Sequence, residues 1–269
     1  MPSEREIALD NEILRGVVGS TTHGTAIEGQ DDRDEMGVFV EPPENVCGLT
    51  PRDHYIYRDQ PEGVRSQPGD LDLTMYSLRR FCRLAAQGNP SVILLLWLPA
   101  HITKTRLGAA LVDMREAFVS KESGKRFLGY LAGQKSRLKG ERANTVRRPE
   151  LVERYGYDTK FAMHALRLGF QGIELMSRRR LTLPVAEPDL TTLRAVRSGQ
   201  INLAEALQMI EDAEKRLGEL VEACTWSADI DGINRFMVKA HIEYWQSRGL
   251  LSGMPGGSST IAALAGPAH

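Results

Sequence analysis

The chain has 269 residues, which is enough for one large domain or two small ones. Its content of 42% hydrophobic and 26% charged residues is ordinary for a globular protein, and a net charge of −1 identifies no polyanionic partner. The three cysteines, Cys47, Cys82 and Cys224, lie far apart without C-x-x-C spacing, which argues against a zinc site or a disulfide framework. The N-terminus has no apolar signal segment, and the longest apolar run, 92–98, is too short to span a bilayer. We therefore expect a cytoplasmic protein.

Charge is unevenly distributed along the chain. Residues 28–72 hold 12 Asp and Glu against 4 Lys and Arg, whereas residues 121–180 hold 15 Lys and Arg against 6 Asp and Glu. An acidic half that could hold metal would then face a basic half that could hold phosphates. The simpler interpretation, a set of solvated basic helices, accounts for many such runs.

The first hundred residues indicate strands with short helices between them. In chain order we expect a leading helix over 3–12, a strand ending at Val18, a turn at Gly19-Ser20, a strand over 32–40, loops with a weak strand over 54–57, and a third strand over 71–75. Pro42-Pro43 should end the second strand, because neither proline can donate a hydrogen bond to a sheet.

Helices dominate after residue 76. The apolar spacing predicts helices over 76–88, from Pro90, over 104–140 as one or two segments, over 157–180, over 193–221 and over 230–245. The whole pattern is typical of an α+β fold. It predicts a small mixed sheet with flanking helices in residues 1–100, a helical domain in 101–250, and a flexible tail in 251–269, where Gly, Ser, Pro and Ala dominate.

The stretch around Asp32 and Asp34 carries the first chemical signal. On a strand, side chains two residues apart point to the same face, so these two carboxylates would stand side by side. They would repel each other unless a cation lay between them, and hard oxygen ligands suit Mg²⁺ or Mn²⁺. Gly19-Ser20 opens a turn whose backbone N–H groups and hydroxyl suit a phosphate. A solvated Asp-x-Asp turn is the alternative, and the order of the elements favours the metal site.

Several motifs resemble a known family. Gly19-Ser20, then His23-Gly24, then Asp32-x-Asp34-x-x-Gly37-Val38 look like the active-site signature of the DNA polymerase β nucleotidyltransferase superfamily. The pattern is most similar to the nucleotidyltransferases associated with bacterial and phage RNA repair. Further segments agree with that family between residues 12 and 245: 76–81, 88–91, 129–134 and 157–167.

The resemblance implies a third metal-binding carboxylate on a neighbouring strand. Asp72 takes that place, with Asp70 as the alternative ligand and a turn or capping aspartate as the non-catalytic interpretation. The residue before the first family aspartate is usually small and is here Asp31. A register shift would make Asp31 a ligand but would spoil the pairing with Asp34, so Asp32 is kept.

The same resemblance implies nucleotide contacts. It assigns Gly19, Ser20 and His23 to nucleotide binding. In the helix predicted over 157–180, Lys160, His164 and Arg167 have i, i+4, i+7 spacing and share one face, where a triphosphate would relieve their mutual repulsion. A solvated basic face is the alternative, and the resemblance favours nucleotide contact.

Together these motifs predict a metal-dependent nucleotidyltransferase. Mg²⁺ or Mn²⁺ held by Asp32, Asp34 and Asp72 would support transfer of a nucleoside monophosphate from a nucleoside triphosphate, ATP among them, to an acceptor hydroxyl. The resemblance makes an RNA end the expected acceptor and a membrane partner unexpected. Two alternatives stay open: an enzyme that modifies a protein or small molecule, and a non-catalytic module that binds RNA or nucleotide.

Overall fold

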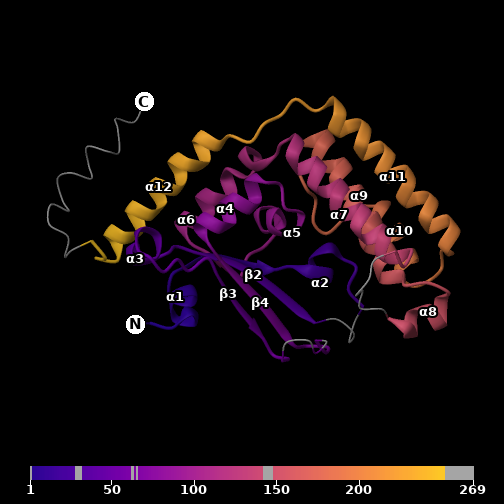
Figure 1. Cartoon of the computed structure of the whole chain (residues 1–269), viewed down its shortest axis with the longest axis horizontal. Coiled ribbons are helices and arrows are strands. Elements are labelled where there is room, and N and C mark those ends of the chain that lie inside the picture. Colours follow the sequence, from indigo (N-terminus) through magenta and orange to yellow (C-terminus); the bar gives the residue numbers. More distant parts are fainter. Residues whose placement is uncertain (1, 28–31, 62–63, 65, 142–147, 252–269) are drawn as a thin grey trace.

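The computed structural model describes residues 2–27, 32–61, 64, 66–141 and 148–251, and its centre is a five-stranded mixed sheet (Figure 1). The strands follow the order β3-β4-β2-β1-β5. Their bounds are β1 (Glu12–Val17), β2 (Arg33–Phe39), β3 (His54–Arg58), β4 (Leu71–Ser77) and β5 (Thr103–Lys104). Strands β2 and β4 run parallel, and all other neighbours run antiparallel.

The two faces of the sheet have different partners. Leu73 and Met75 of β4 and Phe39 of β2 pack against Ile7 of α1 (Glu4–Asp10) in a small cluster. Because side chains alternate along a strand, the opposite face receives Met36 and Val38, which join the main core. Asp34 shares that second face, so the acidic residue lies at the margin of the larger core.

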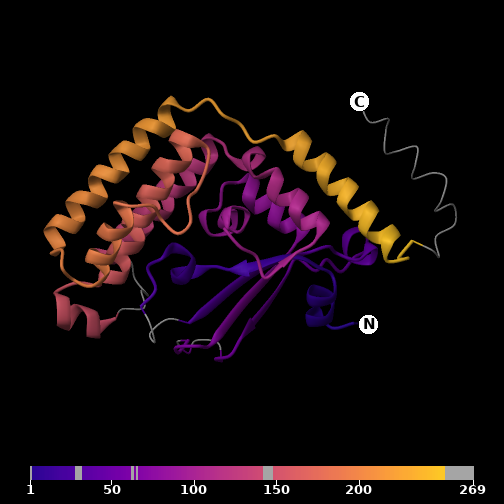
Figure 2. The same cartoon turned by 180° about the vertical axis from the view of Figure 1, so that it is seen from behind.

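Helices cover the second face at three places (Figures 1 and 2). Above the sheet lie α4 (Leu78–Ala86), α5 (Pro90–Ile93), α6 (Arg106–Asp113) and the 3₁₀ helices η1 (Leu94–Trp97) and η2 (Arg115–Phe118). At one end lie α7 (Lys121–Leu138), α8 (Pro149–Tyr155), α9 (Thr159–Arg178), α10 (Asp189–Arg197) and α11 (Leu203–Ala223). At the other end lies α12 (Ile230–Ser247), and the short helices α2 (Gly19–His23) and α3 (Pro43–Cys47) follow β1 and β2.

The helices at the α9 end pack closely because two glycines on α9 let the backbones approach. A Cβ at Gly169 would lie 2.7 Å from the Cβ of Ala213 on α11, and a Cβ at Gly172 would lie 2.6 Å from Leu217. Such small residues allow close helix contact, which fixes the face that α9 turns toward α11 and α7. The main core then runs without interruption from Ile13 in β1 to Tyr244 in α12.

The α+β prediction is confirmed, with differences in detail. The region 44–69 contains most of α3 and a full strand β3, and β5 was not expected. The single helix predicted over 193–221 is two helices, because the chain turns at Gly199, where φ is +74°. The division at residue 100 stays a prediction, and the tail predicted over 251–269 lies almost wholly outside the described residues. Of the helices described, none combines the length and apolar character needed to cross a bilayer.

Candidate active site

Three carboxylates meet where β2 and β4 begin. The parallel register places Asp34 of β2 directly beside Asp72 of β4, and Asp32 immediately precedes β2. Each of the three offers one oxygen, and these oxygens all lie within 4.8 Å of one another. All three residues are only partly exposed. Paired strands therefore hold the acidic group together against its own repulsion.

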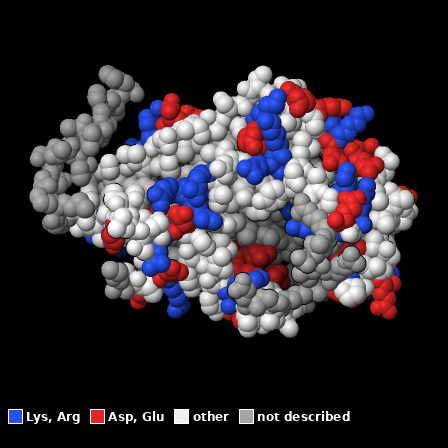
Figure 3. Space-filling view, viewed as in Figure 1, with Lys and Arg blue, Asp and Glu red and all other residues white. Residues whose placement is uncertain are grey.

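A cleft of about 300 Å³ opens beside these carboxylates. In the space-filling view, acidic side chains form the floor of a hollow near the centre of the molecule (Figure 3). The cleft brings together α2, the start of β2 and the first half of α9. Its lining residues are Gly19, Ser20, His23, Thr25, Asp32, Asp34, Arg148, Lys160, His164 and Arg167.

Gly19 allows the close approach of α2 to Asp34. Its φ is +73°, in the left-handed region that side-chain-bearing residues rarely adopt. A Cβ added there would lie 2.1 Å from Oδ2 of Asp34, a severe clash. The backbone N–H of Val18 also donates to the Asp34 carbonyl at 2.9 Å. Glycine at this position is thus what lets Ser20 and the carboxylates share one cleft.

Arg58 of β3 lies on the other side of the acidic group. Its Nη2 donates to Oδ2 of Asp72 at 2.9 Å, and the Ser66 hydroxyl donates to the same oxygen at 2.9 Å. The bond from Arg58 lowers the pKa of Asp72, and the Ser66 bond adds to this. Asp72, followed by Asp32 and Asp34, in turn raises the pKa of Arg58. The carboxylates therefore create a local field that favours a cation, and three hard oxygen donors fit Mg²⁺ or Mn²⁺.

The opposite wall of the cleft is the basic face of α9. Asp158 caps this helix by accepting from the N–H groups of Lys160 and Phe161. The Asp158 carboxylate also accepts from Nη1 of Arg148 at 3.2 Å, which holds that guanidinium beside the helix start. Lys160, His164 and Arg167 do share one face, as their spacing predicts, and that face lines the cleft.

His23 links α2 to α9. Its Nε2 accepts from Nη1 of Arg167 at 2.9 Å, and the same guanidinium nitrogen donates to Oε1 of Gln171 at 2.8 Å. Burial, and then the charge of Arg167, lower the pKa of His23 well below its usual value. Burial and then Arg167 and Lys160 do the same to the pKa of His164. Burial also lowers the pKa of Arg167 to about 10. Both imidazoles are thus neutral near pH 7, and the positive charge stays on Arg167.

The remaining candidate residues lie apart from the acidic group or outside the described residues. Asp70 accepts hydrogen bonds from Gln60 and from the N–H of Gln67, so it belongs to a loop and not to the acidic group. Asp31 lies outside the described residues. Sequence reasoning gave no role to Arg148 or Thr25, which also line the cleft. The Arg147-Arg148-Pro149 run was a visible signal for Arg148, while a lone Thr25 offered none.

The chain is similar to several known proteins. An uncharacterized 38.9 kDa protein from the nrdC-mobD intergenic region of Enterobacteria phage T4 is 26% identical over 141 residues, which are 50% of this chain but only 41% of the phage protein. A solved structure of a nucleotidyltransferase-like protein from Exiguobacterium sibiricum aligns with 97% of this chain and 83% of its own chain, at 13% identity and a TM-score of 0.31. The sequence profile of RlaP, the RNA repair pathway DNA polymerase beta family, matches residues 5–232. The chain belongs to this family.

Proposed function

We propose that this protein transfers a nucleoside monophosphate from a nucleoside triphosphate to an acceptor hydroxyl, and that the acceptor is an RNA end. One observation carries the proposal: Asp32, Asp34 and Asp72 converge within 4.8 Å beside a cleft whose far wall is basic. Carboxylates on one side and cations on the other are what a metal-bound triphosphate requires. Mg²⁺ or Mn²⁺ bound by these aspartates would supply Lewis acidity and neutralise phosphate charge.

The chain's own residues would bind and orient the substrates. Ser20 offers a hydroxyl and a backbone N–H to phosphate oxygens. Lys160 and Arg167 would stabilise the charge that develops on the leaving group, and Arg148 adds a further guanidinium at the same wall. His23 would act as a positioning residue, because its bond to Arg167 fixes the direction of that guanidinium.

The reaction needs no covalent intermediate with the protein. The acceptor oxygen forms a bond to the α-phosphorus, the bond from that phosphorus to the β-bridging oxygen breaks, and pyrophosphate leaves with the electron pair. The acceptor proton is released to water. Positioning and electrostatic stabilisation account for most of the rate in such chemistry.

The test is incubation with each α-phosphate-labelled nucleoside triphosphate, Mg²⁺ or Mn²⁺, and total RNA. We expect label to enter RNA with the native protein and to fall by about 100-fold or more in Asp32→Asn and Asp34→Asn, which keep side-chain shape but lose a charged ligand. Chelation of the divalent cation should remove the transfer as well. Unchanged transfer in the double variant Asp32→Ala/Asp34→Ala would refute the assignment of these residues.

The same assay separates the alternatives. Label that enters the protein fraction or a small molecule and not RNA would replace the RNA end by another acceptor. Nucleotide binding with no transfer to any acceptor would favour the non-catalytic binding module. As a matched control, Asp189→Asn alters a carboxylate at the start of α10, outside the residues that line the cleft.

A further inference from the structure

The sheet face that holds the acidic group continues past Asp72 toward the edge strand β3. Directly paired residues of neighbouring strands share a face, so the register places Arg58, Ile56 and His54 of β3 beside Asp72, Thr74 and Tyr76 of β4. We call these six residues the β3–β4 strip. Because Asp34 pairs with Asp72, the strip lies on the same face as the acidic group.

The strip is open where the rest of that face is covered. Met36 and Val38, on the same face of β2, are buried in the main core. Ile56, by contrast, is 55% exposed, and the neighbouring side chain of His54 is also exposed. A surface depression of about 420 Å³ lies at the His54 end of the strip, and its lining residues are Glu4, Pro51, Arg52, Asp53, His54, Ile56 and Arg80. Exposed apolar and polar side chains therefore face solvent along the strip, from the depression at His54 and Ile56 to Arg58 beside Asp72.

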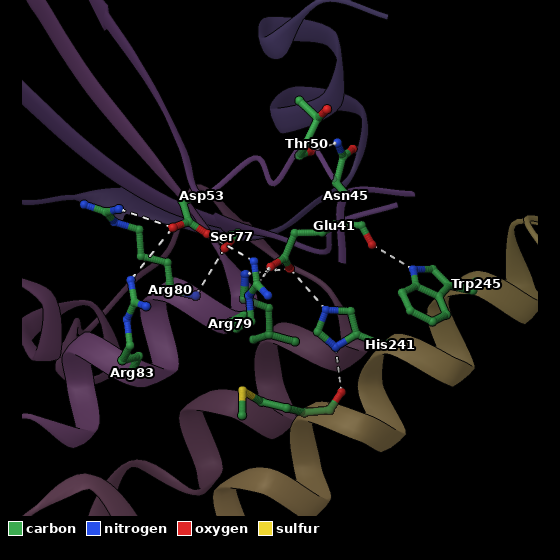
Figure 4. Close-up of polar contacts among 12 residues, drawn as sticks. Glu41, Asn45, Thr50, Asp53, Ser77, Arg79, Arg80, Arg83, His241 and Trp245 are labelled. Atoms are coloured by element: carbon green, nitrogen blue, oxygen red, sulfur yellow. Dashed lines mark hydrogen bonds and ion pairs between the residues drawn. The ribbon is translucent and has the colours of Figure 1, made fainter. Parts of the chain in front are cut away.

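Three arginines of α4 stand at the far end of the strip. Arg79, Arg80 and Arg83 all direct their guanidinium groups toward one carboxylate, that of Asp53 (Figure 4). A second acid, Glu41, lies 3.9 Å from Arg79 but is fully buried and also contacts His241. Positive charge therefore exceeds the negative charge that is accessible, and basic side chains gather over α4 beside the acid-lined hollow (Figure 3).

The geometry of phosphoryl transfer indicates which side of the acidic group the acceptor must occupy. In phosphoryl transfer the attacking and leaving oxygens lie roughly in line. The triphosphate tail is assigned to the side of Ser20, Lys160 and Arg167, so the acceptor must reach the acidic group from the opposite side. Arg58 and Asp72, at the near end of the strip, are on that side.

We infer that the β3–β4 strip and the α4 arginines bind the terminal nucleotides of a single-stranded RNA acceptor, with its terminal hydroxyl at Asp72. This inference rests on the proposed function. The strand from Asp72 to Tyr76 spans about 13 Å, enough for a few nucleotides. Guanidinium groups hold phosphates, and the rings of His54 and Tyr76 present surfaces on which bases stack. Ile56 lies exposed on the same face. Arg80 already lies over the Tyr76 ring, 6.0 Å from its centroid, a geometry that a stacked base can extend.

The first experiment measures binding of a fluorescent single-stranded RNA of about a dozen nucleotides, in a salt series and without any reaction. Arg80→Ala/Arg83→Ala should weaken binding by about 10-fold at low salt. Each lost phosphate contact should also reduce the slope of log affinity against log salt by about 0.7. The control Arg106→Ala/Arg216→Ala removes two exposed arginines of α6 and α11 and should change neither value.

A second pair of variants avoids any question of folding. Ile56 is largely exposed, so Ile56→Glu and Ile56→Gln differ only in charge at a surface position. We expect the glutamate variant to lose most RNA affinity and the glutamine variant to retain it to within about threefold, since only the former repels phosphates. Thermal unfolding of both variants should match.

Nucleotide binding separates this inference from the proposed function. Binding of a nucleoside triphosphate with Mg²⁺ should be equal in the wild type and in all strip variants. Wild-type protein that binds the triphosphate but shows no salt-dependent affinity for the RNA would overturn the strip and leave the nucleotide site standing. RNA affinity that is unchanged in both Arg80→Ala/Arg83→Ala and Ile56→Glu would overturn it too. A wild type that binds RNA through the strip but binds no triphosphate would instead refute the proposed function.

Discussion

Gly19 has a left-handed backbone conformation and lies against the Asp34 carboxylate, so a side chain at this position is poorly tolerated. Gly19→Ala places a methyl group against Asp34 and also strains the backbone, at a cost of about 1–2 kcal/mol in the free energy of unfolding. A displacement of about 1 Å at the reacting groups can cost about 100-fold in rate. We therefore expect a large loss of transfer from a protein that is still folded, measured by initial rates and by urea unfolding.

Gly156 provides the matched control. Its φ is +80°, but a Cβ there would meet no atom within 4 Å. Gly156→Ala should thus show a similar loss of stability and nearly normal transfer. If both variants lost activity equally, backbone strain and not the contact with Asp34 would explain the effect.

A single charge on the basic face of α9 should matter for nucleotide affinity. A hydrogen bond from a charged donor contributes about 1.5–3 kcal/mol, which corresponds to about 10- to 100-fold in binding. Lys160→Met should raise KM for the nucleoside triphosphate by that factor. Lys125→Met, at an exposed position of α7, serves as the control. An unchanged KM in Lys160→Met would mean that the triphosphate does not lie along α9.

The imidazoles of His23 on α2 and His164 on α9 should make stability depend on pH. Burial lowers the pKa of both His23 and His164 well below 6.5, so the unfolded chain takes up protons in acid that the folded protein does not. The free energy of unfolding therefore falls as the pH drops below about 6.5, by up to about 1.4 kcal/mol per pH unit for each histidine.

This pH effect is checked by urea unfolding between about pH 5 and 7, the range in which histidine titrates. In His164→Gln, the free energy of unfolding should depend less steeply on pH, by the contribution of one histidine. In the control His54→Gln, which removes an exposed imidazole, the dependence should stay as in the wild type. A slope that is identical in the wild type and His164→Gln would contradict a lowered pKa of His164 in the folded protein.

How far the sequence could predict the structure depends on how local each feature is. The face shared by Lys160, His164 and Arg167 follows from helical spacing alone, and the structure brings these residues together as expected. The break at Gly199 could not be found in this way, because apolar spacing continues on both sides of it.

Long-range contacts were beyond sequence reasoning. The adjacency of Asp34 and Asp72 needed a resemblance to a family, since the register of parallel strands is set by packing and not by either strand alone. Arg58 reaches Asp72 only because β3, the weakest strand candidate, pairs with β4. No sequence pattern around Glu41 predicts its contact with His241, because the two residues are 200 positions apart in the chain.

At the scale of the molecule, α12 ties the end of the described chain to its beginning. Nε2 of His241 lies 3.1 Å from Oε2 of Glu41, and the Trp245 indole donates to the Glu41 carbonyl at 2.7 Å. The Tyr244 hydroxyl donates to Oδ1 of Asn11 at 2.9 Å. These contacts connect the last helix to both ends of the segment that carries β1, the cleft and β2.

Removal of one partner of this buried pair should be costly. His241→Leu leaves the Glu41 carboxylate fully buried without its imidazole, and we expect a loss of about 3 kcal/mol in the free energy of unfolding. Adding Glu41→Gln removes the stranded charge and should recover about 1 kcal/mol or more. Lys239→Leu, an exposed position on the same helix, is the control. Purely additive losses in the double variant would show that the two side chains do not interact.

The tie made by α12 has a consequence for biosynthesis. Chains fold from the N-terminus as they emerge from the ribosome, yet Glu41 and Asn11 meet their partners only once residues 241–245 have been made. During most of translation, Glu41 of the nascent chain therefore remains exposed to water, because its partners on α12 have not yet been made. The cleft that α2 shares with α9 is likewise incomplete until more than half of the polypeptide has left the tunnel. The complete cleft and the contacts of α12 should thus form late in synthesis.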